Sequence, residues 1–168
     1  MTMTRFALLL ATCFLSLSLA DQAAWSALNR DEASGFRGNR WGAAPNECAS
    51  LRFAGDLGSN ESGQRITLYD RSTVGITMNG TSFNRIRYRF VDNQLESVQL
   101  SYEGRANRDK LLEVIEERYG QPHPGERKNL SRIEWDGEET IVNLDYRTDL
   151  EQGSLWFIST DLNRQFFG

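Results

Sequence analysis

Histidine and cysteine, two side chains that often carry catalysis or bind metal ions, are almost absent from the chain. There is one histidine, His123, and there are two cysteines, Cys13 and Cys48. A tetrahedral zinc site needs four ligands, and no Cys-x-x-Cys or His-x-x-x-His spacing supplies the missing ones. His123 lies in a Pro-His-Pro-Gly segment typical of an exposed loop, without a recognisable nucleophile or acid as its partner. The sequence therefore predicts no catalytic residue, no metal and no cofactor, and the chain is not expected to be an enzyme.

The chain also lacks an apolar run long enough to span a membrane, which takes about 20 residues. The longest mostly apolar run, Phe6–Leu15, follows the basic residue Arg5, and the small residues Ser18 and Ala20 lie just before Asp21. This pattern is typical of a secretory signal that is cleaved between Ala20 and Asp21. We therefore expect an exported protein without a transmembrane segment in its mature chain. The periplasm is the expected compartment, and the extracellular space is the alternative.

Disulfide bonding within the mature chain is excluded if the signal is removed, because Cys13 leaves with it and Cys48 has no partner. We predict that Cys48 is buried as a small apolar residue, and pairing with another chain is the alternative. Leu10–Cys13 is similar to the lipobox of bacterial lipoproteins, although Thr12 fits that motif poorly. A lipid anchor at Cys13 is therefore the disfavoured reading.

Clusters of basic residues are missing as well. Removal of Arg5 with the signal leaves 18 basic and 23 acidic side chains, a net charge of −5. Proteins that bind nucleic acids draw most of their affinity from clustered cations on the phosphate backbone. Nucleic acid is therefore not an expected partner.

What the chain does have is a strong period-two alternation of apolar and polar residues, which is typical of β-strands. Two successive strands are predicted with these inward-facing residues: Ile86, Tyr88 and Phe90, then Val98, Leu100 and Tyr102. A three-residue loop at 92–94 would place Tyr88 opposite Val98 and keep the two apolar faces together. A two-residue loop would place Tyr88 opposite Ser97, so the sequence favours the longer loop.

A helix is predicted from Asn107, as its N-cap, to Tyr119, because Gly120 and Pro122 end the helical pattern. A hairpin around Asp136 and Gly137 and a strand at 155–158 follow it. Before these elements, residues 44–51 are expected to form a short helical segment begun by Pro45, and residues 55–63 an exposed loop.

The predicted fold class is α+β, an antiparallel meander sheet with one main helix packed on one face and the other face solvated at least in part. The expected organisation is a signal peptide at 1–20, an N-terminal segment at 21–35 that could be mobile, and a single α+β domain at 36–168. A chain of this length fits one domain with its own core.

Several short motifs lie along most of the mature chain, and they mark turns, core aromatic residues and a helix end. They are Phe36-x-Gly38-x-x-Trp41-Gly42, Tyr69-Asp70-Arg71, Ile86-x-Tyr88-x-Phe90, Leu95-x-x-Val98, the helix end Leu112 to Tyr119-Gly120, Trp135-x-Gly137-x-x-Thr140 and Leu144-x-Tyr146. In these motifs the chain resembles a group of small exported bacterial domains of uncharacterised function. The resemblance implies a bacterial envelope location and an α+β fold, and it implies no catalytic residue.

One charged pattern is a candidate binding face. Arg85, Arg87 and Arg89 alternate with apolar residues, so they are expected to project from one face of a strand, where guanidinium groups could bind an acidic protein surface or an anionic envelope component. A charged, solvated sheet face is the simpler interpretation of the same pattern. A second hypothesis is a small-molecule module with a cavity between helix and sheet, lined by Tyr88, Tyr102, Trp135 and Tyr146. The sequence indicates neither the oligomeric state nor the identity of a partner.

Overall fold

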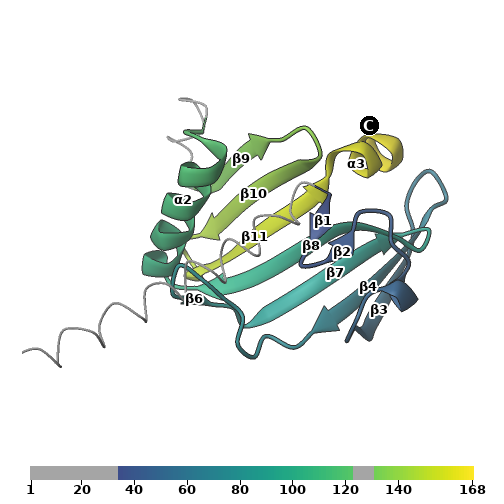
Figure 1. Ribbon diagram of the computed structural model, residues 1–168, viewed down its shortest axis with the longest axis horizontal. Helices are drawn as coiled ribbons and strands as arrows, with labels where there is room; N and C mark the ends of the chain where they lie inside the picture. The colour runs from purple at the N-terminus through teal and green to yellow at the C-terminus, as the bar shows by residue number, and fades with distance from the viewer. Residues whose placement is uncertain (1–33, 123–130) are drawn as a thin grey trace, which may run out of the picture.

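The computed structural model of the protein describes residues 34–122 and 131–168 (Figure 1). The predicted signal peptide, its cleavage site at Ala20 and Asp21, most of the N-terminal segment 21–35 and the loop histidine His123 lie outside the described residues. The account that follows concerns the described ranges.

A seven-stranded antiparallel sheet forms the body of the molecule (Figure 1). In the order in which they lie side by side, its strands are β3 (Arg52–Ser59), β4 (Arg65–Arg71), β7 (Arg85–Val91), β8 (Gln94–Glu103), β11 (Gln152–Ser159), β10 (Thr140–Arg147) and β9 (Arg132–Asp136). The smaller elements are the pairs β1 (Gly35–Phe36) with β2 (Asn39–Arg40) and β5 (Thr77–Met78) with β6 (Thr81–Ser82), and the 3-10 turn η1 (Pro45–Glu47).

Two helices lie at opposite ends of the sheet (Figure 1). The main helix, α2 (Arg105–Tyr119), packs on one face through the fully buried side chains of Leu111 and Ile115. A short helix that the sequence did not predict, α3 (Thr160–Phe167), follows β11 directly. In the described part of the chain, neither helix has the length and apolar character needed to span a bilayer. The α+β class, with an antiparallel sheet and one main helix, is confirmed.

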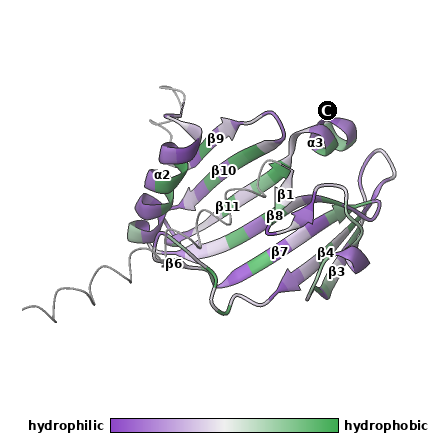
Figure 2. Cartoon of the chain, in the orientation of Figure 1, coloured by the Kyte–Doolittle hydropathy of each residue, from purple (hydrophilic) through white to green (hydrophobic). Residues whose placement is uncertain are grey.

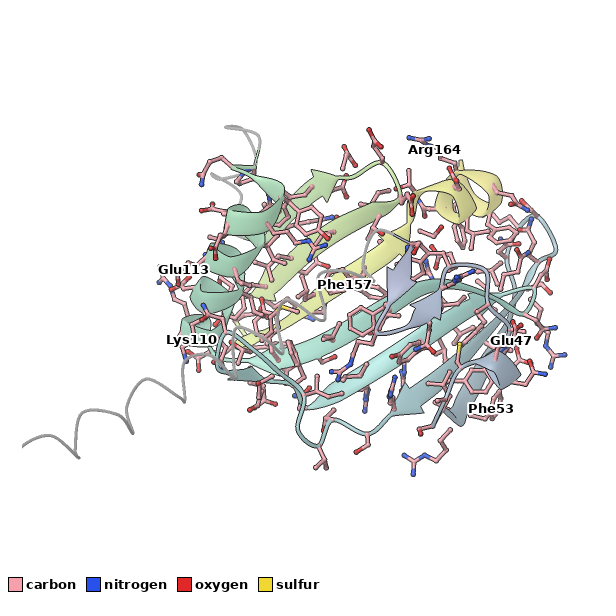
Figure 3. The ribbon with its side chains drawn as sticks, viewed as in Figure 1. Glu47, Phe53, Lys110, Glu113, Phe157 and Arg164 are labelled. Atoms are coloured by element: carbon pink, nitrogen blue, oxygen red, sulfur yellow. The ribbon has the colours of Figure 1, made fainter. Side chains whose placement is uncertain are left out.

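The face of the sheet that packs against α2, which we call the core face, carries one continuous hydrophobic core. Figure 2 shows hydrophobic and hydrophilic residues alternating along the strands, as expected when only one face is buried. Phe36 of β1 closes part of this face, with its ring centre 6.2 Å from that of Tyr88 and 5.1 Å from that of Phe157, which is labelled in Figure 3. Cys48 lies in the same core, as predicted, and burial raises the pKa of its thiol.

The pairing of β7 with β8 confirms the predicted register, although the turn between them is not the predicted one. Tyr88 lies opposite Val98, but the loop has two residues, Asp92 and Asn93, instead of three. Both have positive φ, 47° and 63°, which is the backbone geometry of a tight hairpin. A register shift between Arg89 and Phe90 leaves Glu96 as an extra residue in β8, and this bulge restores the alignment of the apolar faces.

Two further predictions are corrected. Residues 52–59 form the edge strand β3, where an exposed loop was expected from 55 to 63. Its glycine-rich stretch pairs with β4 because register shifts next to Gly55 and Gly58 absorb the irregular spacing. The N-cap of α2 is Gly104, and Asn107 lies inside the first turn, where its amide donates to the carbonyl of Glu103.

Candidate binding site on the outer sheet face

The arginine row lies on the outer face of the sheet, by which we mean the face opposite α2. Arg85, Arg87 and Arg89 of β7 pair with Ser101, Gln99 and Ser97 of β8, as the sequence predicts. Cross-strand partners share a face, so the row continues into a set of polar side chains on the next strand. The three arginines differ, however, in what they contact.

Arg87 and Arg89 are occupied by acidic partners within the protein. Arg87 donates two hydrogen bonds to Asp70 of β4, at 2.8 and 3.1 Å, and these hydrogen bonds hold the pKa of Asp70 below its usual value. Arg89 donates to the carboxylate of Glu96 at 2.7 Å, and its guanidinium carbon lies 5.1 Å from the ring centre of Phe167 in α3. These two side chains therefore stabilise the fold and are poorly placed to bind a ligand as free cations.

Arg85 is different, because it is exposed and forms no ion pair with any of the described residues. It lies at the α2 end of the sheet, on the rim of an open hollow of about 810 Å³. The other lining residues are Asn84, Gln99, Ser101, Tyr102, Ser131, Asp145, Tyr146, Arg147, Gln152, Gly153, Ser154 and Trp156. The volume falls within the range of small-molecule sites, and most of the lining side chains are polar.

The floor of the hollow is a row of polar side chains across four strands. Arg85 pairs with Ser101, Ser101 with Ser154, and Ser154 with Asp145. Trp156 lies two residues beyond Ser154 on the same face of β11, and its indole Nε1 donates to Ser154 Oγ at 2.9 Å. This hydrogen bond fixes the orientation of the indole beside the serine hydroxyls.

Asp145 is the acidic residue of this floor, and its surroundings oppose its ionisation. Burial raises the pKa of the Asp145 carboxyl above its usual value. Arg132, whose Nε lies 3.9 Å away, and a hydrogen bond with Trp156 oppose that shift only in part. Arg147, on the rim, is paired with Asp149 at 3.0 Å. Within the described residues, Arg85 is the cation of the hollow that forms no ion pair, so the site favours a ligand that carries negative charge.

A glycine makes room for the aromatic side chains beneath the hollow. A Cβ at Gly153 would lie 2.2 Å from Cζ of Tyr102, so no larger residue fits without displacing that ring. The Tyr102 hydroxyl donates to the carbonyl of Asp145 at 2.9 Å and ties β8 to β10 across the glycine. Its ring stacks on that of Tyr146.

The four aromatic residues of the second hypothesis are packed in the core, and two of them, Tyr102 and Tyr146, also line the outer hollow from beneath. Tyr88, Tyr102, Trp135 and Tyr146 are between 0 and 5% exposed, and all four belong to the hydrophobic core beneath α2. Among the described residues, no three His, Cys, Asp or Glu side chains converge as metal ligands would. The hollow on the outer face is thus the best candidate site.

Sequence reasoning found Arg85 but missed Trp156, Ser154 and Asp145. The sequence predicts a strand at 155–158 but assigns no faces to it, and β11 places Leu155 and Phe157 on the core face and Trp156 on the outer one. The pairing of β8 with β11 brings these residues near Arg85, and only knowledge of that pairing could have identified them from the sequence. Comparison with protein-family models, curated proteins and solved structures finds no match to this chain.

Proposed function

We propose that the chain is an exported domain without enzymatic activity whose outer sheet face binds an anionic component of the bacterial envelope or an acidic protein surface. Export rests on the signal-like sequence of residues 1–20. The observation that carries the proposed binding is Arg85, a cation without an ion pair among the described residues, on the rim of an open polar hollow.

The neighbouring arginines support the same assignment by contrast. Arg87 and Arg89 form ion pairs with acidic residues on β4 and β8, whereas Arg85 forms no ion pair with any of the described residues. Its side chain is therefore available for the paired, charge-assisted hydrogen bonds that a guanidinium forms with a carboxylate or phosphate.

The test compares Arg85→Glu with Arg164→Glu, a matched charge reversal on α3 at the other end of the sheet (Figure 3). The mature protein is mixed with isolated bacterial envelope fragments and sedimented at low and high salt. We expect the wild type and Arg164→Glu to sediment with the fragments, Arg85→Glu to stay in solution with an unchanged circular dichroism spectrum, and salt to weaken binding because exposed charges are screened. Equal sedimentation of both variants would show that Arg85 is not the binding cation.

A further inference from the structure

The polar floor of the hollow indicates which class of anion fits it. Ser101, Ser154 and Gln99 project hydroxyl and amide groups from neighbouring strands. Trp156 lies beside them with its indole fixed by the hydrogen bond to Ser154, and the guanidinium carbon of Arg89 lies over its ring, 6.0 Å from the centre. Hydroxyls and amides both donate and accept hydrogen bonds, so they suit a ligand that does the same at several positions. A simple anion such as phosphate would use Arg85 and leave the rest of this lining without a partner.

The position of the hollow on the sheet disfavours an extended peptide. Peptides most often bind sheets by adding a strand at an edge, where main-chain groups are unpaired. The floor belongs to β7, β8, β11 and β10, each of which has a hydrogen-bonded strand on both sides. A ligand in the hollow therefore meets side chains, and its recognition depends on hydroxyl, amide, indole and guanidinium groups.

The length of the polar row matches an elongated ligand. Arg85 and Asp145 are separated by three strand-to-strand steps, which at about 4.8 Å each is a distance of about 14 Å. The C–H groups of a sugar ring carry partial positive charge and pack against the electron-rich face of an indole. A carboxylate on the sugar would complete the match by binding the guanidinium of Arg85.

Resting on the proposed function, we propose that the hollow binds an acidic oligosaccharide, with a sugar carboxylate on Arg85, a ring face against Trp156 and ring hydroxyls on Ser101, Ser154 and Gln99. The carboxylate can belong to a uronic acid or to a lactyl-ether sugar such as muramic acid, because both present the same group. The Asp145 carboxyl lies at the opposite end of the polar row from Arg85, which the sugar carboxylate contacts. Burial raises the pKa of this carboxyl.

Calorimetric titration of the mature protein with linear trigalacturonic acid tests this proposal. Neutral galactotriose tests the need for the carboxylates, tricarballylate tests a carboxylate ligand without sugar rings, and N-acetylmuramic acid tests the second source of the acid. We expect trigalacturonic acid to bind more tightly than galactotriose and tricarballylate. The variants are Arg85→Gln and Trp156→Ala, with Arg164→Gln as the control at the other end of the sheet.

Trp156→Ala is expected to weaken trigalacturonic acid binding by about tenfold or more, and Trp156→Phe to retain most of it, because a ring face remains. Arg85→Gln should remove the preference for the acid over galactotriose. Ligand binding should also change tryptophan fluorescence in the wild type and not in Trp156→Phe. Unchanged affinity in Trp156→Ala would overturn the saccharide assignment, and equal binding of acid and neutral sugar would overturn the role of the carboxylate on Arg85.

The outcomes separate this inference from the proposed function. If tricarballylate binds as tightly as trigalacturonic acid and depends on Arg85, the site binds anions and the saccharide assignment is wrong. If none of the probes binds while Arg85→Glu still abolishes sedimentation with envelope fragments, the ligand is an acidic component of another class. If neither probe binding nor sedimentation depends on Arg85, both proposals fail.

Discussion

The two faces of the sheet are formed by the same strands but are stabilised in different ways. Leu100 of β8 is 1% exposed among the core residues, whereas the preceding residue, Gln99, is partly exposed on the outer face, opposite Arg87. Because successive side chains of a strand point to opposite faces, one strand can carry core residues and surface residues independently. The outward-facing polar residues of the hollow, such as Gln99 and Ser101, can therefore vary in chemistry without weakening the core.

The outer face is itself divided. At the α3 end, Glu96 is fully buried and Arg89 lies against the aromatic rings of Trp156 and Phe167. At the α2 end, the hollow is open and Arg85 is exposed. Glu96 and Arg89 are held by packing whereas Arg85 faces solvent, so equal changes of charge at Arg89 and Arg85 should have unequal effects on stability.

The largest effect is expected from Arg89→Met, which removes the partner of a buried carboxylate. Glu96 has no exposed surface, and Arg89 is the residue that pairs with it. An unpaired buried charge costs about 3–5 kcal/mol of unfolding free energy. Chemical denaturation of wild type and variant measures this loss, and Arg85→Met, in the same strand but exposed, serves as the control with little expected change.

The double variant Arg89→Met/Glu96→Leu sharpens the interpretation. Replacing both members of a buried pair by apolar residues is often neutral, so most of the lost stability should return. A double variant as unstable as Arg89→Met alone would show that Arg89 stabilises the protein by packing against the rings of Trp156 and Phe167, and not by neutralising Glu96.

A smaller effect is expected from Leu100→Ala, which leaves a cavity in the core face. Large-to-small substitutions of this kind cost about 2–5 kcal/mol, depending on how far the surroundings relax. The matched control is Gln99→Ala, one residue away on the outer face, with an expected change within about 0.5 kcal/mol. The difference in denaturation midpoint between the two variants measures how differently the core face and the outer face contribute to stability. Equal losses of stability would show that the two faces contribute alike.

The sequence predicts the centre of this fold better than its margins. The pattern of Ile86, Tyr88 and Val98 is sufficient to predict both the strands and their register, because a slip by one residue would expose the whole apolar face. The turn at Asp92 and Asn93 was predicted one residue too long, since a bulge at Glu96 compensates for a shorter loop and leaves no hydrophobic signal.

The missed elements are those whose stability comes from tertiary contacts. β3 is rich in glycine, as loops are, and among the described strands it pairs with β4 alone. The apolar residues of α3, such as Phe166, stabilise the helix only when the folded protein offers a surface against which they can be buried. The hollow was missed for a related reason: Trp156 and Asp145 lie far from Arg85 in sequence and meet it through strand pairings that no local pattern specifies.

The smallest predicted effect concerns Asp145, whose carboxyl is raised in pKa by burial in the folded protein. A raised pKa means that the folded state binds this proton more tightly than the unfolded state, so stability is lost as pH rises through the folded pKa and the ionised carboxyl is unfavourable at pH 7. Asp145→Asn should therefore raise the thermal midpoint slightly at pH 7. The gain should disappear below the ordinary aspartate pKa of about 3.9, where the carboxyl is protonated in both states.

Asp149→Asn is the matched control for this prediction, and its expected sign is the opposite one. The hydrogen bond from Arg147 holds the pKa of Asp149 below its usual value, so its contribution to stability is present near neutral pH and is lost as pH falls through the lowered pKa. Thermal unfolding of wild type and both variants between pH 3 and pH 8 gives the comparison. A lower midpoint for Asp145→Asn at pH 7 would mean that the contact with Arg132 and the hydrogen bond with Trp156 outweigh the cost of burying the carboxyl.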